Sequence, residues 1–355
     1  MPITHVRTHH LTAELHTPFV TALRRTTETK SLVVELIDEE GRCGLGEAPQ
    51  VWQVTGASIA GSQSCVDAVL APLLIGRDPD EVAILSRAVE RAVRDNHAAK
   101  MAIDIALHDL SARRQNLSLV RHLGGAATSV ETDVTLSAGQ IEGLREAAAA
   151  RVKDGFTTLK LKVGIDAAGD LARITAVREA AGPGVTIRVD ANQGWTPRDA
   201  VRVIRGFEDA GLGIEFVEQP VPHWDLDGLA WVSERVDTPV MADEAVFGVR
   251  DLVEVIRRRA ADLVNVKLAK CGGLTNARTL LELARAHEIG TVVGSMMESR
   301  IAIGAAAALV AAYPTTAVSD LDAAWWISTS PVQGGIRYEG SRILLPQAPG
   351  LGVEL

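Results

Sequence analysis

Two periodicities of apolar residues divide the chain. From about residue 131 to residue 322, short β-branched runs alternate with longer stretches whose apolar residues recur at helical spacing, such as QIEGLREAAAARVKDG and NARTLLELARAHEIG. Several of these stretches end in Gly, and a strand-like run begins a few residues later. This alternation predicts parallel strands joined by helical crossovers.

The strand-like runs of this region recur about every 25 residues, which is the repeat expected of a (β/α)8 barrel of about 250 residues. Eight runs can be counted, and they begin near Thr132, Thr157, Thr186, Ile214, Pro239, Leu263, Thr291 and Ala317. The regular spacing favours closure of the sheet. We therefore predict a modified TIM barrel over residues 126–325.

Residues 1–125 follow a different pattern. The segments VRTHHLTAEL and KSLVVELIDEEGRCGLGEA, with a turn at Glu40-Gly41, predict antiparallel strands, and the following segments predict helices. Residues 326–355 are rich in Gly and contain short strand-like pieces. The expected fold is thus an α/β barrel with an amino-terminal α+β capping domain, to which the carboxyl-terminal tail returns.

Composition narrows the class of protein. A hydrophobic fraction of 47% with 23% charged residues is typical of globular proteins, and no long uncharged apolar stretch suggests a membrane span. The first residues lack the apolar core of a secretory signal, which predicts a cytoplasmic location. A net charge of −9 disfavours nucleic acid as a partner and favours a small-molecule ligand. Assembly into a homo-oligomer stays open.

The cysteines do not indicate a disulfide framework or a structural zinc site. Cys43, Cys65 and Cys271 are few, scattered and without a CxxC pair. We interpret them as packed thiols.

Acidic residues end three successive strand candidates. Asp190, Glu218 and Asp243 should face one point, because the carboxyl ends of barrel strands meet at one face. Each alone could be a solvated carboxylate or an ion-pair partner. Three such carboxylates in succession, without His or Cys, favour one Mg²⁺ ion per active site.

Lysines occupy interior positions of two strand candidates. Lys160 and Lys162 alternate with apolar residues and should point into the barrel, with Lys267 facing them four strands further round. Amines on two sides of a metal could remove a proton from one face of a carbon and return one to the other, which is racemisation or epimerisation. The base would need its pKa lowered by ~3 units. Alternatively, the lysines only pair with the three acids.

A second acidic pair, Asp320 and Asp322, follows the last strand candidate and is expected away from the metal set. These carboxylates could hold an ammonium group. A helix cap or a solvated rim carboxylate is the alternative.

The motifs KLK, DANQGW, VEQP, ADE and NVKLAKCGG, in this order, resemble the muconate lactonizing subgroup of the enolase superfamily. AAKMAIDIALHDLSARR and GLGEAP are similar to parts of the capping domain of that family. The resemblance implies that Asp190, Glu218 and Asp243 bind Mg²⁺ and that Lys162 and Lys267 are the acid/base catalysts. It also implies that Lys160 supports the charge of the substrate carboxylate.

Within this subgroup, the resemblance points to dipeptide epimerases. The run TVVGSMMES contains no His, which argues against the branch in which a His works opposite the Lys. The sequence DLD at 320–322 resembles the aspartate pair with which dipeptide epimerases hold the α-ammonium group. The implied reaction is epimerisation of a dipeptide at the α-carbon of its carboxyl-terminal residue.

The side-chain preference is expected from the capping loops and the end of strand seven. The loop with Arg24 resembles that of L-Ala-D/L-Glu epimerases, in which an Arg meets the glutamate side chain, although adjacent Arg25 leaves the register ambiguous. Ser295 and Met297 are further substrate-binding candidates. Open alternatives are hydrophobic or mixed dipeptides, an o-succinylbenzoate synthase, an N-succinylamino acid racemase, a cycloisomerase, and a binding protein without catalysis.

Overall fold

A long antiparallel hairpin begins the chain in the computed structural model, which describes residues 1–355. The sheet order is β1-β2-β3, with bounds Ile3–Val20, Arg25–Asp38 and Cys43–Pro49. Successive side chains of β2 face opposite sides of the sheet. Val33 accordingly belongs to the large barrel core, and its neighbours Leu32 and Val34 belong to a separate core within the cap. The sheet is therefore packed on both faces.

Helix α4 covers one face of this sheet at very short range. A Cβ atom at Gly46 would lie 1.8 Å from the carbonyl oxygen of Ala102 on α4, so only glycine permits the approach. This contact explains the GLGEA run of β3. The helical segments of the cap are α1 (Ile59–Cys65), η1 (Val66–Leu70), α2 (Ala71–Leu74), α3 (Val82–Ala92), α4 (His97–Arg114) and α5 (Leu119–His122).

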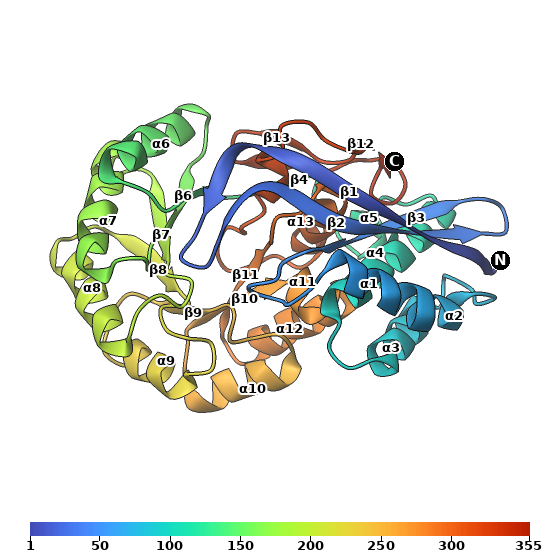
Figure 1. The fold of residues 1–355 in the computed structure, drawn as a ribbon, viewed down its shortest axis with the longest axis horizontal. Helices are drawn as coiled ribbons and strands as arrows, with labels where there is room; N and C mark the ends of the chain where they lie inside the picture. The colour runs from blue at the N-terminus through green and yellow to red at the C-terminus, as the bar shows by residue number, and fades with distance from the viewer.

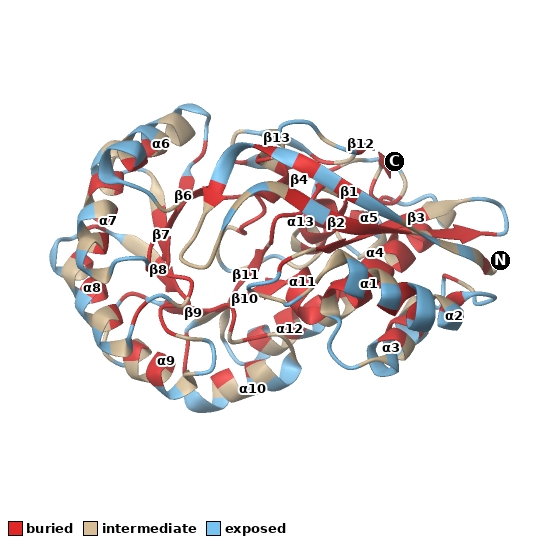
Figure 2. Ribbon diagram, viewed as in Figure 1, coloured by how far each residue is buried: buried red, intermediate tan, exposed pale blue.

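Seven parallel strands form the curled central sheet, in the order β5 to β11 along the chain. Their bounds are Val134–Leu136, Thr158–Lys162, Thr186–Asp190, Ile214–Glu218, Val240–Ala242, Leu263–Lys267 and Gly290–Gly294. Figure 1 shows helices α6 to α10 along the outer side of this sheet, and Figure 2 shows that the strands are buried whereas the helices expose their outer faces. The structure confirms the predicted modified TIM barrel with an α+β cap.

The helices of the barrel follow the strands in alternation. They are α6 (Ile141–Lys153), α7 (Ala167–Ala181), α8 (Pro197–Asp209), α9 (Leu226–Ser233), α10 (Val249–Arg258), α11 (Leu268–Cys271), α12 (Leu274–Ala286) and α13 (Arg300–Ala312). No helix of the structure combines the length and apolar character that a bilayer span requires.

The eighth strand, predicted to begin near Ala317, is not a regular strand. One isolated bridge joins Ser319 to Thr132, where the first strand was expected to begin. Side-chain hydroxyls replace part of the missing ladder, because Thr316 Oγ1 accepts from the backbone of Thr291 at 2.7 Å and Ser319 Oγ accepts from that of Val293 at 3.2 Å. The apolar run predicted a strand, but side-chain hydroxyls of this segment accept hydrogen bonds from the backbone N–H groups of β11.

The tail after the barrel packs back on the cap. Leu119 donates its N–H to the carbonyl of Gly350 at 2.8 Å, and the Arg113 guanidinium donates to the carbonyl of Val353 at 2.7 Å. The remaining segments are η2 (Ala323–Trp325) and the strands β4 (Ser129–Glu131), β12 (Gln333–Gly334), β13 (Arg337–Glu339), β14 (Arg342–Leu344) and β15 (Val353–Glu354). Strands β13, β14 and β4 pair in a small sheet, which links the tail to the entry of the barrel.

Candidate active site

A pocket lies where the cap meets the carboxyl ends of the barrel strands. Its walls combine residues of β1 and the β1–β2 turn, the loop at Val54, and residues on or just after six strands and the last strand-like segment of the barrel. The lining residues are Phe19, Thr21, Leu23, Arg24, Val54, Thr135, Lys162, Asn192, Asp243, Glu244, Lys267, Ser295, Met296, Met297, Asp320 and Asp322. The hairpin that extends across the barrel in Figure 1 therefore forms one wall of the pocket.

The three acidic residues predicted as metal ligands lie at the ends of neighbouring strands. Asp190 ends β7, Glu218 ends β8, and Asp243 follows β9 directly. All three are at most 1% exposed. Buried carboxylates require partners, because removing a charge from water is costly unless it is paired. Here the partners are lysine side chains.

Lys162 and Lys267 each meet a different acid. The Lys162 ammonium lies 2.5 Å from a carboxylate oxygen of Asp190, and that of Lys267 lies 2.7 Å from one of Asp243. Both lysines are 6% exposed and line the pocket. The two predicted catalytic groups thus reach one pocket from strands β6 and β10.

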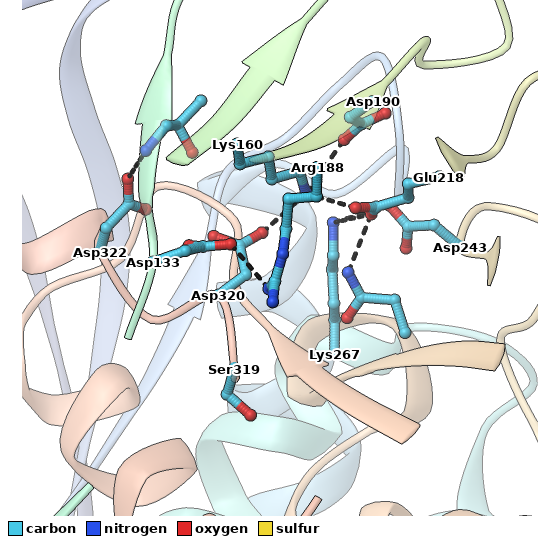
Figure 3. Close-up of polar contacts among 12 residues, drawn as sticks. Asp133, Lys160, Arg188, Asp190, Glu218, Asp243, Lys267, Ser319, Asp320 and Asp322 are labelled. Carbon is cyan, nitrogen blue, oxygen red and sulfur yellow. Dashed lines mark hydrogen bonds and ion pairs between the residues drawn. The ribbon is translucent and has the colours of Figure 1, made fainter. Parts of the chain in front are cut away.

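Lys160 lies at the centre of the charged cluster, as Figure 3 shows. Its ammonium group is 3.0 Å from Asp190, 2.5 Å from Glu218 and 2.8 Å from Asp320. The prediction that Asp320 lies away from the metal set is therefore wrong. The long Lys160 side chain spans the barrel interior and joins that carboxylate to Asp190 and Glu218.

The carboxylates differ in how readily they ionise. Burial and the charge of Asp190 raise the pKa of Glu218 to about 7, and the opposing effect of the Lys160 charge is smaller. Burial also opposes ionisation of Asp320, but Lys160 and Lys267 hold the pKa of that carboxyl at about 2. Asp320 is thus ionised at neutral pH, which a partner for an ammonium group must be.

The pKa of Lys267 is raised, whereas the sequence led us to expect a lowered pKa for the catalytic bases. Burial disfavours the ammonium form, but Asp243 and Glu218 together outweigh burial. The increase arises because Asp243 contacts the amine directly at 2.7 Å. A dication that neutralised these acids would remove the cause of the increase.

Asp322 is fixed by two donors on one oxygen. Its Oδ2 accepts from the backbone N–H of Thr135 at 2.7 Å and from the indole N–H of Trp326 at 2.8 Å. Burial and the charge of Asp320 raise the pKa of Asp322 to about 6. Asp320 and Asp322 both line the pocket, although they reach different neighbours.

The remaining substrate-binding candidates also line the pocket. Arg24 comes from the β1–β2 turn, and Ser295 and Met297 follow β11. Burial lowers the pKa of Arg24, and the nearby charge of Glu298 opposes this shift. None of the ion pairs in the structure involves the Arg24 guanidinium, so it is available to an acidic ligand.

Several charged residues of the cluster did not enter the sequence-based prediction, among them Lys270, Arg188, Asp133 and Glu244. Lys270 on α11 is 1% exposed and lies 2.5 Å from Asp243. Arg188 lies two residues before Asp190 on β7 and pairs with Asp133 at 3.0 Å, as Figure 3 shows. The same period of two that places Lys160 and Lys162 inside the barrel could have found Arg188. Lys270 follows its strand on a helix, where that period gives no signal.

The oxygen atoms around the cluster fit a hard divalent cation. Glu244 Oε2 and Asn192 Oδ1 are buried and accept no hydrogen bond, and Glu218 Oε2 has only the Lys160 ammonium beside it, at 2.5 Å. Such oxygens suit Mg²⁺ better than nitrogen or sulfur ligands would. No three acidic, His or Cys side chains converge closely enough to hold an ion as they stand, because lysine ammonium groups lie between the carboxylates. The donor chemistry therefore fits the ion. Binding it would require the lysine ammonium groups to move away from the carboxylate oxygens that they now contact.

Comparisons with known proteins place the chain in a family. Residues 3–124 match the mandelate racemase / muconate lactonizing enzyme N-terminal domain, and residues 143–355 match the enolase C-terminal domain-like family. The chain therefore belongs to the mandelate racemase / muconate lactonizing enzyme family of the enolase superfamily.

Three curated relatives span almost the whole chain. It is 41% identical to the L-Ala-D/L-Glu epimerase of Bacillus subtilis, covering 99% of this chain and 97% of that protein. Identity to the hydrophobic dipeptide epimerase of Enterococcus faecalis is 38%, over 98% of both chains. Identity to the N-succinyl-L-Arg/Lys racemase of Bacillus cereus is 32%, over 100% of this chain and 96% of that one.

Solved structures of two of these relatives superpose closely. The TM-score is 0.97 for the substrate-liganded B. subtilis epimerase, with 99% of each chain covered. It is 0.96 for the E. faecalis dipeptide epimerase complexed with Mg and the dipeptide L-Leu-L-Tyr, with 100% of each chain covered. All of these relatives are epimerases or racemases, and the present chain is accordingly an enzyme of the isomerase class.

Proposed function

We propose that this enzyme is a Mg²⁺-dependent dipeptide epimerase that inverts the α-carbon of the carboxyl-terminal residue, with L-Ala-D/L-Glu as its substrate. The observation that carries the proposal is the placement of Lys162 and Lys267 in one pocket on strands separated by three others. Two amines so placed can serve the two faces of one carbon. The names of the relatives in B. subtilis and E. faecalis, both dipeptide epimerases, support a dipeptide substrate.

Asp190, Glu218 and Asp243 would hold the metal ion. Bound Mg²⁺ would neutralise the additional negative charge that the substrate carboxylate acquires when the α-proton leaves. The three carboxylates end neighbouring strands of a rigid sheet, which limits how far they can move apart. One ion per active site accounts for the set.

The proton transfer uses the two lysines in opposite roles. One lysine, as a neutral amine, takes the proton from the α-carbon and becomes an ammonium group, and the electron pair of the C–H bond passes into the carboxylate as an enediolate. The other lysine, as an ammonium group, gives its proton to the opposite face of the same carbon. Lys160 stays protonated, because Asp320 and Glu218 outweigh the burial of its ammonium group and raise its pKa, and its charge stabilises the enediolate.

The other end of the dipeptide is a cation at neutral pH. Asp320 and Asp322 provide negative charge for this α-ammonium group at the side of the pocket that faces the last barrel segment. Asp320 now holds Lys160 at 2.8 Å, so an ammonium group is a partner that this carboxylate already accepts. Asp322 lacks a charged partner in the ion pairs of the structure and can take one.

The acidic side chain of the substrate is assigned to Arg24, with Ser295 and Met297 forming the adjoining wall. A guanidinium that lines a pocket without a protein carboxylate partner favours an anionic ligand. This assignment selects L-Ala-D/L-Glu over the hydrophobic dipeptides for which the E. faecalis relative is named.

The proposal is tested by incubating L-Ala-L-Glu with the enzyme and Mg²⁺ in D₂O. We expect deuterium to enter only the glutamyl α-carbon, with formation of L-Ala-D-Glu, as followed by proton NMR and chiral chromatography. Absence of exchange across a broad dipeptide panel would contradict the proposal.

An N-succinylamino acid racemase is the second candidate, because the relative from B. cereus is an N-succinyl-L-Arg/Lys racemase. An N-succinyl group carries a carboxylate where a dipeptide carries an ammonium group. Asp320, with its pKa held at about 2, would repel that carboxylate. Asp320→Asn should therefore weaken turnover of dipeptides and strengthen that of N-succinyl substrates, whereas a racemase of the second class would show little loss.

A further inference from the structure

Trp326 packs directly against one carboxylate of the substrate pocket. Its indole Nε1–H donates to Asp322 Oδ2 at 2.8 Å, and the backbone N–H of Thr135 donates to the same oxygen at 2.7 Å. The other oxygen of Asp322 receives no hydrogen bond from the protein, and Asp322 lines the pocket. One oxygen is thus used for positioning and the other is left for a ligand.

The cap fixes the ring of Trp326 on its other side. The Trp326 ring stacks on His16 with centroids 5.0 Å apart and meets the Phe19 ring edge-on at 6.0 Å. Both neighbours belong to β1, and Phe19 lines the same pocket. The side chain is 5% exposed, so its orientation is determined by these contacts.

The backbone around Trp326 replaces a missing part of the hairpin. Pairing between β1 and β2 is interrupted between Glu14 and Phe19. There the N–H of His16 donates to the carbonyl of Trp326 at 2.9 Å, and the N–H of Ser328 donates to the carbonyl of Glu14 at 2.9 Å. The segment with Trp326 is therefore joined to the strand that leads to the β1–β2 turn and Arg24.

From this geometry we propose that Trp326 is the positioning residue of the α-ammonium site: its indole N–H aims Asp322 at the substrate, and its ring ties that carboxylate to β1 of the cap. The inference rests on the dipeptide epimerase proposed above. A buried carboxylate held by two donors keeps one orientation, which reduces the entropy lost when the ammonium group binds.

Trp325 provides a matched control within the same aromatic cluster. It contacts His16 with ring centroids 4.8 Å apart, Phe156 at 5.4 Å, and the Arg151 guanidinium at 4.6 Å from its ring centroid. The indole N–H of Trp326 donates to the Asp322 carboxylate, whereas Trp325 donates only its backbone N–H, to the Asp322 carbonyl. Replacing either residue by Phe retains an aromatic ring, but only Trp326→Phe removes a donor from the ammonium site.

The experiment compares Trp326→Phe and Trp325→Phe in the Mg²⁺-loaded full chain. In Trp326→Phe we expect the KM for L-Ala-L-Glu to rise about tenfold with kcat changed much less, because a hydrogen bond to a charged group is lost. The Ki of N-propionyl-L-glutamate, which has the shape of the dipeptide without its ammonium group, should stay at the wild-type value. Trp325→Phe should keep both constants.

Two results would overturn the inference: an unchanged KM in Trp326→Phe, or equal increases of KM and Ki, which would indicate general damage to the pocket. If the wild-type enzyme exchanges no dipeptide α-proton, the proposed function itself fails. That outcome is seen in the wild type alone, so it is distinguished from a failure of the Trp326 inference, which appears only in the variants. Indole NMR supplies a second test that does not need a folded Trp326 variant. The indole N–H resonance of Trp325 is identified first, because it disappears in Trp325→Phe. In Asp322→Asn, one of the remaining indole N–H resonances should move upfield. If none moves, the inference is also overturned.

Discussion

Lys162 and Lys267 line one pocket, although β6 and β10, the strands that carry them, are separated by β7, β8 and β9 in the sheet. Lys162 pairs with Asp190 at 2.5 Å and Lys267 with Asp243 at 2.7 Å. Curling of the sheet brings the two amines to a common space from different sides. This relationship is the observation on which the proposed two-base mechanism rests.

Replacing either lysine by Arg should separate exchange from epimerisation. Arg keeps the positive charge beside the acid but does not lose its proton at neutral pH. We expect epimerisation of L-Ala-D/L-Glu to fall by about 10²- to 10⁴-fold in each variant. Exchange of the α-proton in D₂O should survive for one configuration in Lys162→Arg and for the opposite configuration in Lys267→Arg, as measured by NMR.

The exposed Lys153 at the end of α6 supplies the control for this prediction. Lys153→Arg should retain wild-type rates for both configurations. Loss of exchange for the same configuration in both pocket variants would mean that one lysine alone handles the proton, contrary to the two-base mechanism.

The sequence was sufficient for the fold class and for the placement of the main charges. A period of two puts Lys160 and Lys162 on the interior face of β6, and closure of the sheet brings strand ends together, whatever their separation in the chain. Periodicity does not say how far a side chain reaches. That is why the contact between Lys160 and Asp320 was not predicted, although both residues were selected.

Other features depend on three-dimensional detail that no pattern contains. The segment near Ala317 has strand-like residues, but the hydroxyls of Thr316 and Ser319 take over hydrogen bonds that a strand backbone would accept. Likewise, the raised pKa of Lys267 follows from the distance to Asp243, which alternation along a strand cannot specify.

Removing the metal should abolish activity and lower stability. A ligand at a hundredfold excess over its Kd stabilises the folded state by about 2.7 kcal/mol. For a chain of this size we expect Mg²⁺ at that excess to raise the Tm by about 4 °C relative to EDTA. In Asp243→Asn the increase should disappear, because one of the three ligands is lost, and scanning fluorimetry measures the difference.

Asp237→Asn is the control for the metal prediction, since Asp237 is exposed, lies before β9 and does not contact the pocket. It should retain the full Mg²⁺-dependent increase in Tm. An increase of the same size in Asp243→Asn would show that the ion binds elsewhere.

The neighbouring arginines at the β1–β2 turn should differ in their effect on substrate choice. Arg24 lines the pocket, whereas Arg25 is exposed. Arg24→Met should lower kcat/KM for L-Ala-L-Glu by about 10- to 100-fold, because an acidic side chain loses a charged partner. The value for L-Ala-L-Leu should stay the same or rise.

Arg25→Met should leave both substrates unaffected and serves as the matched control. Steady-state kinetics with the two dipeptides give the ratio of kcat/KM for L-Ala-L-Glu to kcat/KM for L-Ala-L-Leu. If Arg25→Met, and not Arg24→Met, lowered the ratio, the assignment of the side-chain partner would have to move by one residue.

Two histidines at the contact of cap and barrel should make stability depend on pH. His108 Nδ1 and His122 Nε2 lie 3.3 Å apart, and His108 Nε2 lies 3.2 Å from the Thr275 hydroxyl on α12. Two ring nitrogens this close share one proton, so at least one histidine must be neutral. Burial and the neighbouring His108 lower the pKa of His122 to about 4.

The sign of the effect follows from proton binding. Between pH 4 and 6.5 the unfolded chain binds a proton at His122 that the folded chain does not, so acidification favours unfolding. The stabilisation is complete above pH 6.5 and is lost as the pH falls toward 4. Urea unfolding across this range should show a shallower decline in His122→Asn than in the wild type. His5→Asn, which changes an exposed histidine of β1, should keep the wild-type slope, and an equal slope in all three proteins would show that the pair does not titrate on unfolding.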